Sequence, residues 1–113
     1  VTIGALTTIH QFCQMGDYSF AGMNASITMD VPSYIKVASN PARVVGLNSV
    51  GMERGGIDQE TIIFLKKAYK IIYRKGYNLK DAIEKVESIV TNDVQEVRNF
   101  IDSIKSSERG ILR

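Results

Sequence analysis

Residues 3–32 read IGALTT, IHQFCQ, MGDYSF, AGMNAS and ITMDVP, a run of six-residue segments whose first and fifth positions carry small or aliphatic side chains. Each fifth position comes two residues before the next first position, so along a strand both side chains point to the same side. This pattern is typical of a parallel β-helix, in which short strands wind into stacked coils. The side chains expected to face inward are those of Ile3, Thr7, Ile9, Cys13, Met15, Ser19, Ala21, Ala25, Ile27 and Val31.

The second position of these segments is often glycine, as at Gly4, Gly16 and Gly22. Glycine tolerates backbone conformations that other residues avoid, so we expect these positions to turn the chain between strands. In such proteins three segments make one triangular coil, and a solenoid needs about three or more repeats to bury a continuous core. Because fewer than two coils are present, we expect the chain to be the C-terminal fragment of a longer protein.

The second half of the chain changes to the apolar spacing of amphipathic helices. Asp58 and Asn78 are favourable N-cap residues, and Gly76 suits the end of the first helix. Asn92 is expected to open a third helix, with Gln95 completing a capping box. Helices joined by such short turns predict a compact bundle. The expected helices run over 59–75 and 79–90 and from 92 onward.

A transition is expected between the coils and the helices. Pro32 interrupts regular pairing, short strands follow, and Gly51, Gly55 and Gly56 predict a loop before the first helix. The sequence thus predicts a β-helix plus α architecture: the last coils of a parallel β-helix, a transition of loop and short strands, and a C-terminal helical domain. These parts are expected to span residues 1–34, 35–57 and 58–113.

The composition is that of one globular domain or part of one, with 44% hydrophobic and 23% charged residues. The formal charge of +2 is too small to predict a nucleic-acid partner. One cysteine cannot form an intrachain disulfide and suits a reducing compartment, so we expect a cytoplasmic protein. The sequence contains no apolar run of the length that spans a bilayer and no signal segment at its start, so stable membrane insertion is not expected.

The only histidine, His10, and the only cysteine, Cys13, are expected to diverge. His10 follows inward-facing Ile9 and so points outward, whereas Cys13 occupies an inward position. One histidine and one cysteine cannot complete a zinc shell, so no metal site is predicted. A histidine can act as a general base, but it needs an orienting partner. No carboxylate adjoins His10 in the sequence, and an exposed or interfacial imidazole is the alternative to a functional one.

Two other outward-facing features allow a structural and a functional interpretation. Met23 occupies the third position of its segment, where a long apolar side chain favours a partner, either a neighbouring subunit or an alkyl chain in a groove. Lys66, Lys70 and Arg74 recur every four residues and line one face of the first helix. Such a face is either simply solvated or docks an acidic partner.

Several motifs recur in one enzyme family: TTIHQF at 7–12, DVPSY at 30–34, GLNSVGMER at 46–54, AYKIIYRKG at 68–76 and RGILR at 109–113. With them the chain resembles the C-terminal portion of the acyl-carrier-protein–UDP-N-acetylglucosamine O-acyltransferases of lipid A biosynthesis, a family of hexapeptide-repeat acyltransferases. The resemblance covers almost the whole chain. The helical AYKIIYRKG motif is its most specific part, because other hexapeptide acyltransferases share the six-residue repeats.

The resemblance implies a left-handed parallel β-helix, a C-terminal helical domain and a homotrimer with active sites between neighbouring subunits. Enzymes of this family transfer an (R)-3-hydroxyacyl group from acyl carrier protein to the 3-hydroxyl of UDP-N-acetylglucosamine, with no metal or other cofactor. A histidine serves as general base, because a sugar hydroxyl is a poor nucleophile until its proton is removed. That base belongs to an earlier coil, so residues 1–113 alone are expected to be inactive.

The resemblance also implies roles for individual residues. His10 matches a supporting active-site histidine rather than the base, and Gln11 a neighbour that contacts substrate. Asn48 and Arg54 match positions near the UDP part of the substrate. Met23 matches a position that limits acyl-chain length, which predicts a shorter donor than glycine would allow. Carrier-protein docking is implied for Lys66, Lys70 and Arg74. Departures from the family occur at Val50, where an acidic residue is common, and at Gly55, where a second arginine is found.

Two other interpretations stay open at this point. The first is a different hexapeptide acyltransferase, which acylates an amine or transfers an acetyl group. The second is a non-catalytic trimeric β-helix scaffold. A zinc-dependent β-helix of the carbonic-anhydrase type would need several outward histidines, and this chain has one.

Overall fold

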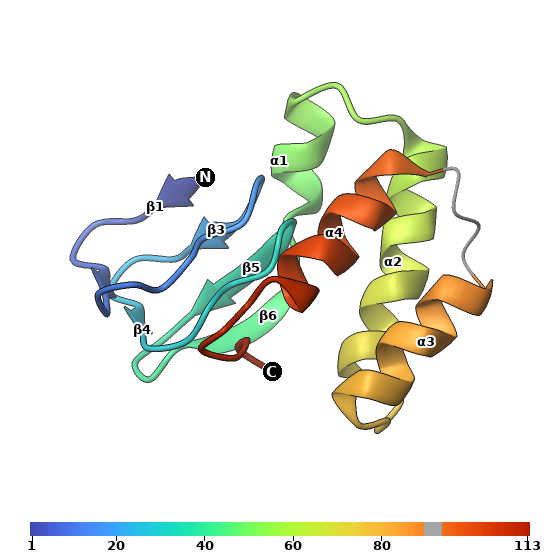
Figure 1. The fold of residues 1–113 in the computed structure, drawn as a ribbon. Coiled ribbons are helices and arrows are strands. Elements are labelled where there is room, and N and C mark those ends of the chain that lie inside the picture. Colours follow the sequence, from blue (N-terminus) through green and yellow to red (C-terminus); the bar gives the residue numbers. More distant parts are fainter. Residues whose placement is uncertain (90–93) are drawn as a thin grey trace.

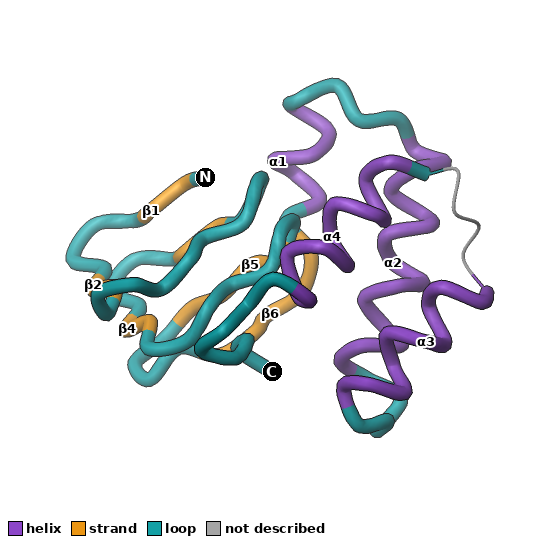
Figure 2. Tube along the Cα trace, viewed as in Figure 1, coloured by secondary structure: helices purple, strands orange, loops and turns teal. Residues whose placement is uncertain are grey.

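The computed structural model describes residues 1–89 and 94–113, in which the short strands precede the helices along the chain (Figures 1 and 2). The strands and helices are β1 (Thr2–Ile3), β2 (Thr8–Ile9), β3 (Phe20–Ala21), β4 (Ser26–Ile27), β5 (Ile35–Ala38), β6 (Arg43–Leu47), α1 (Ser49–Arg54), α2 (Gln59–Tyr73), α3 (Leu79–Ile89) and α4 (Gln95–Lys105). One hydrophobic cluster of buried residues extends from the strands through the helices to the C-terminal tail.

The strands form stacked parallel coils, as the six-residue pattern predicts. Strand β1 pairs in parallel with β3, with Thr2 opposite Phe20, so the paired residues are three segments apart. The same separation joins β2 to β4. Strand β3 then pairs in parallel with β5, where Phe20 lies opposite Lys36. The architecture is that of a left-handed parallel β-helix followed by helices, which confirms the predicted fold class.

Burial follows the predicted inward positions most closely in the later segments. Ala21, Ala25, Ile27 and Val31 are at most 1% exposed. Ile3, also predicted to face inward, is 51% exposed because β1 is the edge strand of its sheet and is covered from one side only. Ile9 and Cys13 are half-buried and His10 is exposed, so the predicted divergence of His10 and Cys13 is confirmed.

The turns between strands do not lie at the glycines where they were expected. Left-handed backbone recurs every six residues at the fourth position of the first four segments, at Leu6, Phe12, Tyr18 and Asn24, with φ between 59° and 68°. Non-glycine residues adopt this region rarely, and the stacked hydrogen bonds hold them there.

The glycines of the coils serve a different purpose, which is close approach between successive coils. A Cβ at Gly4 would lie 2.7 Å from the Met23 nitrogen, and one at Gly16 would lie 2.3 Å from the Ser33 nitrogen. Both contacts are too short for any side chain, so only glycine allows the backbones to pack at these points.

The transition contains one element that was not predicted. Strands β5 and β6 form an antiparallel hairpin, in agreement with the expected short strands. Gly51, however, lies inside helix α1 and not in a loop. The Asn48 side chain caps this helix by accepting a hydrogen bond from Gly51 N, and the helix is too short to give a periodic signal in the sequence.

Helices α2 and α3 begin at the predicted caps. The Asp58 carboxylate accepts a hydrogen bond from Thr61 N at 2.8 Å, and hydrogen bonding to the Thr61 side chain and backbone lowers the pKa of Asp58. Asn78 Oδ1 accepts from Asp81 N at 2.9 Å. The left-handed backbone of Gly76 follows the end of α2. The expected cap at Asn92 lies outside the described residues, and Gln95 is the first residue of α4.

The C-terminal tail returns to the coils and pairs with them (Figure 1). Asp30 N donates to the Gly110 carbonyl at 3.0 Å, and Leu112 N donates to the Asp30 carbonyl at 2.8 Å. The Asp30 side chain is 5% exposed, and its carboxylate accepts hydrogen bonds from Gln14 N and from the Ser107 hydroxyl. A single buried residue thus joins the tail to two neighbouring coils.

Gly16 is expected not to tolerate alanine, because the added Cβ would meet Ser33 backbone atoms that cannot rotate away. We expect Gly16→Ala to lower the free energy of unfolding by about 1–3 kcal/mol, measured by urea denaturation. Gly46→Ala is the matched control, since a Cβ there meets nothing within 4 Å, and it should be neutral or slightly stabilising. Equal stability of the two variants would contradict the close-packing role of Gly16.

Candidate functional site

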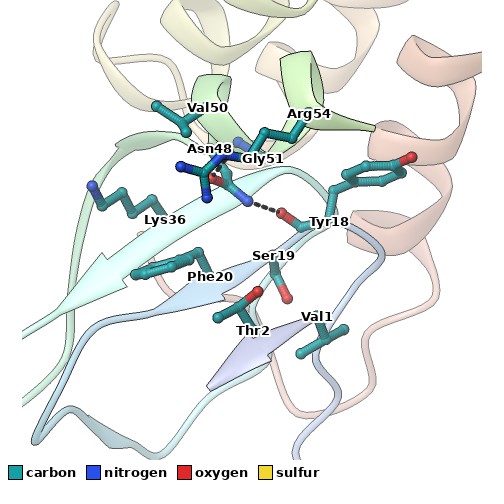
Figure 3. Close-up of a pocket in the computed structure, with 10 residues that line it drawn as sticks. All are labelled: Val1, Thr2, Tyr18, Ser19, Phe20, Lys36, Asn48, Val50, Gly51 and Arg54. Atoms are coloured by element: carbon teal, nitrogen blue, oxygen red, sulfur yellow. Dashed lines mark hydrogen bonds between the residues drawn. The ribbon is translucent and has the colours of Figure 1, made fainter. Parts of the chain in front are cut away.

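A pocket of about 510 Å³ lies where the outer face of the coils meets helix α1 (Figure 3). Strands β1, β3 and β5 place Thr2, Phe20 and Lys36 opposite one another, so these three outward side chains form a ladder along one wall. Helix α1 supplies the opposite wall, including Val50 and Arg54.

The pocket is positively charged. Lys36 Nζ lies 5.4 Å from the centre of the Phe20 ring, a cation–π contact that holds the ammonium group over the ladder. Arg54 reaches into the same pocket from the last turn of α1 (Figure 3). The lining residues that the structure describes include no carboxylate. Two cations beside an aromatic ring suit a phosphate-bearing ligand.

Asn48 holds α1 in place beside the pocket. It is 8% exposed, its Nδ2 donates to the Tyr18 carbonyl at 2.8 Å, and its Oδ1 accepts from Gly51 N at 3.2 Å. The side-chain amide therefore ties the start of α1 to a turn of the coils, and through α1 it positions Arg54. Direct contact between Asn48 and a substrate stays a prediction.

Gly55, which follows the end of α1, packs directly against the Tyr18 ring. A Cβ at Gly55 would lie 2.6 Å from atoms of the Tyr18 ring. The Tyr18 ring in turn stacks on Tyr34, with ring centroids 5.7 Å apart. At this position the protein therefore has a tyrosine ring packed against glycine.

His10 and Gln11 are exposed and line a different part of the surface. Neither borders the pocket that contains Lys36 and Arg54, because the segment that carries them forms another face of the coil. Met23 is 71% exposed, as its outward position predicts. Within this chain, the residues expected at the site are therefore separated into distinct surface regions.

The basic face of α2 is exposed at Lys66, Lys70 and Arg74, as predicted. Arg74 also donates to the Tyr69 hydroxyl at 3.0 Å, so its guanidinium is held against the helix. Beside this face lies a groove of about 280 Å³ with an apolar floor and a basic rim. Its lining consists of Lys67, Lys70, Ile71, Lys75, Tyr77, Lys85 and Ile89.

Sequence reasoning missed Lys36 and Lys85 as members of these sites. Lys36 becomes a pocket residue only because β5 pairs beside β3, and Lys85 reaches the basic groove from α3. The available signal for the pocket was Lys36 itself. A lysine in the middle of a predicted strand is expected to lie on the outward face of that strand.

Over residues 1–89 and 94–113, no group of three or more His, Cys, Asp and Glu side chains is arranged to hold a metal ion. Within the same part of the chain, none of the helices has the length and apolar character needed to cross a membrane.

Residues 30–112 match a family model described as UDP N-acetylglucosamine O-acyltransferase, domain 2. Curated relatives include the acyl-[acyl-carrier-protein]–UDP-N-acetylglucosamine O-acyltransferases of Ectopseudomonas mendocina, 41% identical, and Stutzerimonas stutzeri, 43% identical. In both cases the match covers 98% of this chain and 43% of the relative, so the chain spans less than half of their length.

Solved structures agree with the sequence relatives. The UDP-N-acetylglucosamine acyltransferase of Bacteroides fragilis superimposes with a TM-score of 0.94 at 38% identity, over 98% of this chain and 43% of that one. The Arabidopsis enzyme superimposes with a TM-score of 0.92 at 28% identity, over 99% of this chain and 42% of that one.

Removal of the Asn48 amide is expected to loosen α1. Asn48→Ala would leave the Tyr18 carbonyl and the Gly51 N–H without their partner, at a cost of about 1–3 kcal/mol in the free energy of unfolding. Asn48→Asp keeps the acceptor for Gly51 N but sets a carboxylate oxygen against the Tyr18 carbonyl in a site that is 8% exposed, so it too should be less stable than the unsubstituted protein. Urea denaturation measures all three, and an unchanged stability of Asn48→Ala would refute the anchoring role.

Proposed function

Because the chain belongs to the UDP-N-acetylglucosamine O-acyltransferase family, we propose that it forms the C-terminal part of an enzyme that acylates UDP-N-acetylglucosamine. The donor is an (R)-3-hydroxyacyl group on acyl carrier protein, and the acceptor is the 3-hydroxyl of the sugar. This is the first step of lipid A biosynthesis, and we propose a cytoplasmic location for it.

The observation that carries this proposal is the cationic pocket between the coils and α1. Lys36 and Arg54 supply two positive charges at one pocket of about 510 Å³, which suits the diphosphate of a UDP-sugar. Phe20 offers an apolar ring surface in the same wall. Asn48 acts by positioning α1, since its side-chain amide is bonded to Tyr18 and Gly51.

The proposed chemistry is general-base catalysis. A histidine in a preceding coil removes the proton from the sugar hydroxyl as it attacks the thioester carbonyl of the acyl donor, and the carrier thiol leaves. His10 supports this step from the outer face of its coil, and Gln11 contacts substrate beside it. No cofactor takes part in the proposed reaction.

A homotrimer would bring the separate surface regions of different copies together. Apolar side chains project from the outer face of the coils at Leu6, Phe12 and Met23, which are 81%, 81% and 71% exposed. Large exposed apolar groups of this kind favour contact with another copy of the chain. We propose that the active site lies between neighbouring subunits, with His10 of one copy facing the pocket region of the next.

The carrier protein is proposed to dock on the basic face of α2, formed by Lys66, Lys70 and Arg74. An acidic partner would be steered to this face, and the adjoining groove has an apolar floor that could receive its nonpolar side chains.

The pocket cations are expected to set the affinity for the UDP-sugar. The test uses a chimera in which residues 1–113 replace the matching C-terminal region of the Ectopseudomonas mendocina relative. Loss of a charge-assisted hydrogen bond costs about 1.5–3 kcal/mol, so Lys36→Ala and Arg54→Ala should each weaken binding by about tenfold or more in calorimetry. Arg98→Ala removes the same charge from an exposed position of α4 and should bind normally. Equal affinity of all variants would refute the pocket as the UDP site.

Met23 is expected to limit the length of the acyl chain. Each buried methylene contributes about 0.8 kcal/mol, which corresponds to about fourfold in kcat/KM per methylene. In the same chimera, Met23→Gly should shift the preference toward longer 3-hydroxyacyl donors, whereas Met23→Leu keeps the bulk and should keep the preference. An unchanged donor preference in Met23→Gly would remove Met23 from this role.

A further inference from the structure

The C-terminal tail places an arginine against the outward histidine of the coils. Arg109 Nη1 lies 3.2 Å from His10 Nδ1, and Arg109 Nη2 donates to the Gln11 carbonyl at 3.1 Å. One guanidinium therefore holds both the ring and the backbone of the same short stretch, although 99 positions separate Arg109 from His10.

The chemistry of the two groups determines the direction of the His10 contact. A guanidinium has donors and no acceptor, so His10 Nδ1 must accept the hydrogen bond. An imidazole whose Nδ1 accepts is neutral and carries its hydrogen on Nε2. In this arrangement His10 presents an Nε2–H donor to the exterior, and its other nitrogen is occupied. Such a ring can donate to a substrate oxygen but has no free lone pair to act as a base.

The backbone next to Arg109 is held by hydrogen bonds to the coils. The next residue, Gly110, has left-handed backbone with φ of 100°, its N–H donates to the Ser107 hydroxyl, and its carbonyl accepts from Asp30 N. Because the carboxylate of buried Asp30 also accepts from Ser107, the tail on the C-terminal side of Arg109 is fixed to the coils. The backbone that carries the Arg109 side chain is thus hydrogen-bonded to the coils next to His10.

We propose that Arg109 is a positioning residue for His10, which fixes the imidazole orientation and the tautomer with hydrogen on Nε2. This inference concerns a residue outside the set assigned above, and its consequence for acyl transfer rests on the proposed function. It also explains in physical terms why His10 supports the reaction without serving as its base.

The first test reads the tautomer directly. His10 is the only histidine of the 113-residue chain, so nitrogen NMR of isotope-labelled histidine reports on one imidazole. In alkaline buffer, where an imidazole is neutral, Nε2 should show the shift of a protonated nitrogen and Nδ1 that of an acceptor. In Arg109→Ala the two shifts should move toward each other, because both tautomers become populated.

Two control variants distinguish the effect of losing a positive charge from the effect of losing the hydrogen-bond geometry of the guanidinium. Arg98→Ala removes one positive charge from an exposed position of α4 and should leave both His10 shifts unchanged. Arg109→Lys keeps the charge but lacks the planar fork, so its shifts should lie between those of the other two proteins. Superimposable His10 shifts in the unsubstituted chain and in Arg109→Ala would overturn the inference.

A second readout distinguishes this inference from the proposed function. In the chimera, Arg109→Ala should lower kcat for acyl transfer by about tenfold, a loss typical of removing a histidine's orienting partner, with a smaller change in KM for the UDP-sugar. Altered NMR shifts with an unchanged kcat would uphold the positioning of His10 and refute its supporting role in catalysis. A change in kcat with unaltered shifts would overturn the positioning instead.

Discussion

The structure depends on the close parallel stacking of its coils. Gly16 N donates to the Val31 carbonyl at 2.8 Å, and the backbones come so near that a Cβ at Gly16 or Gly4 has no space. Since side chains alternate along each strand, this stacking fixes which of them turn inward to the core and which outward. The ladder that ends at Lys36 follows from that alternation, and so does the exposure of His10 beside half-buried Ile9.

Buried Asp30 connects the stacked coils to the C-terminal tail. Its backbone pairs with the tail, and its carboxylate accepts from Gln14 N at 2.7 Å and from the Ser107 hydroxyl at 2.6 Å. A buried carboxylate without donors would be costly, so these contacts hold together segments that are remote in sequence. The C-terminal tail therefore returns to the face of the coils that carries His10.

Much of the fold could be predicted from local patterns. The features that were missed or misassigned depend on contacts between residues that are remote in sequence. The six-residue repeat predicted the coils, and the caps at Asp58 and Asn78 predicted two helices. The turns were assigned to glycines, whereas residues such as Phe12 adopt left-handed backbone because stacking overrides local preference. Helix α1 was missed because its 6 residues are too few for a periodic signal and because part of its anchor is the Tyr18 carbonyl, 30 positions from Asn48.

The sequence by itself determined the direction of each coil side chain and the basic face of α2, because both follow from periods of a few residues. Only the tertiary structure decided which outward groups share a site. Lys36 meets Arg54 because β5 stacks beside β3 and Asn48 anchors α1 to the coils, and His10 meets Arg109 because the tail pairs with Asp30. Periodicity is a property of neighbouring residues, whereas convergence at a site depends on long-range hydrogen bonds and packing that no short stretch encodes.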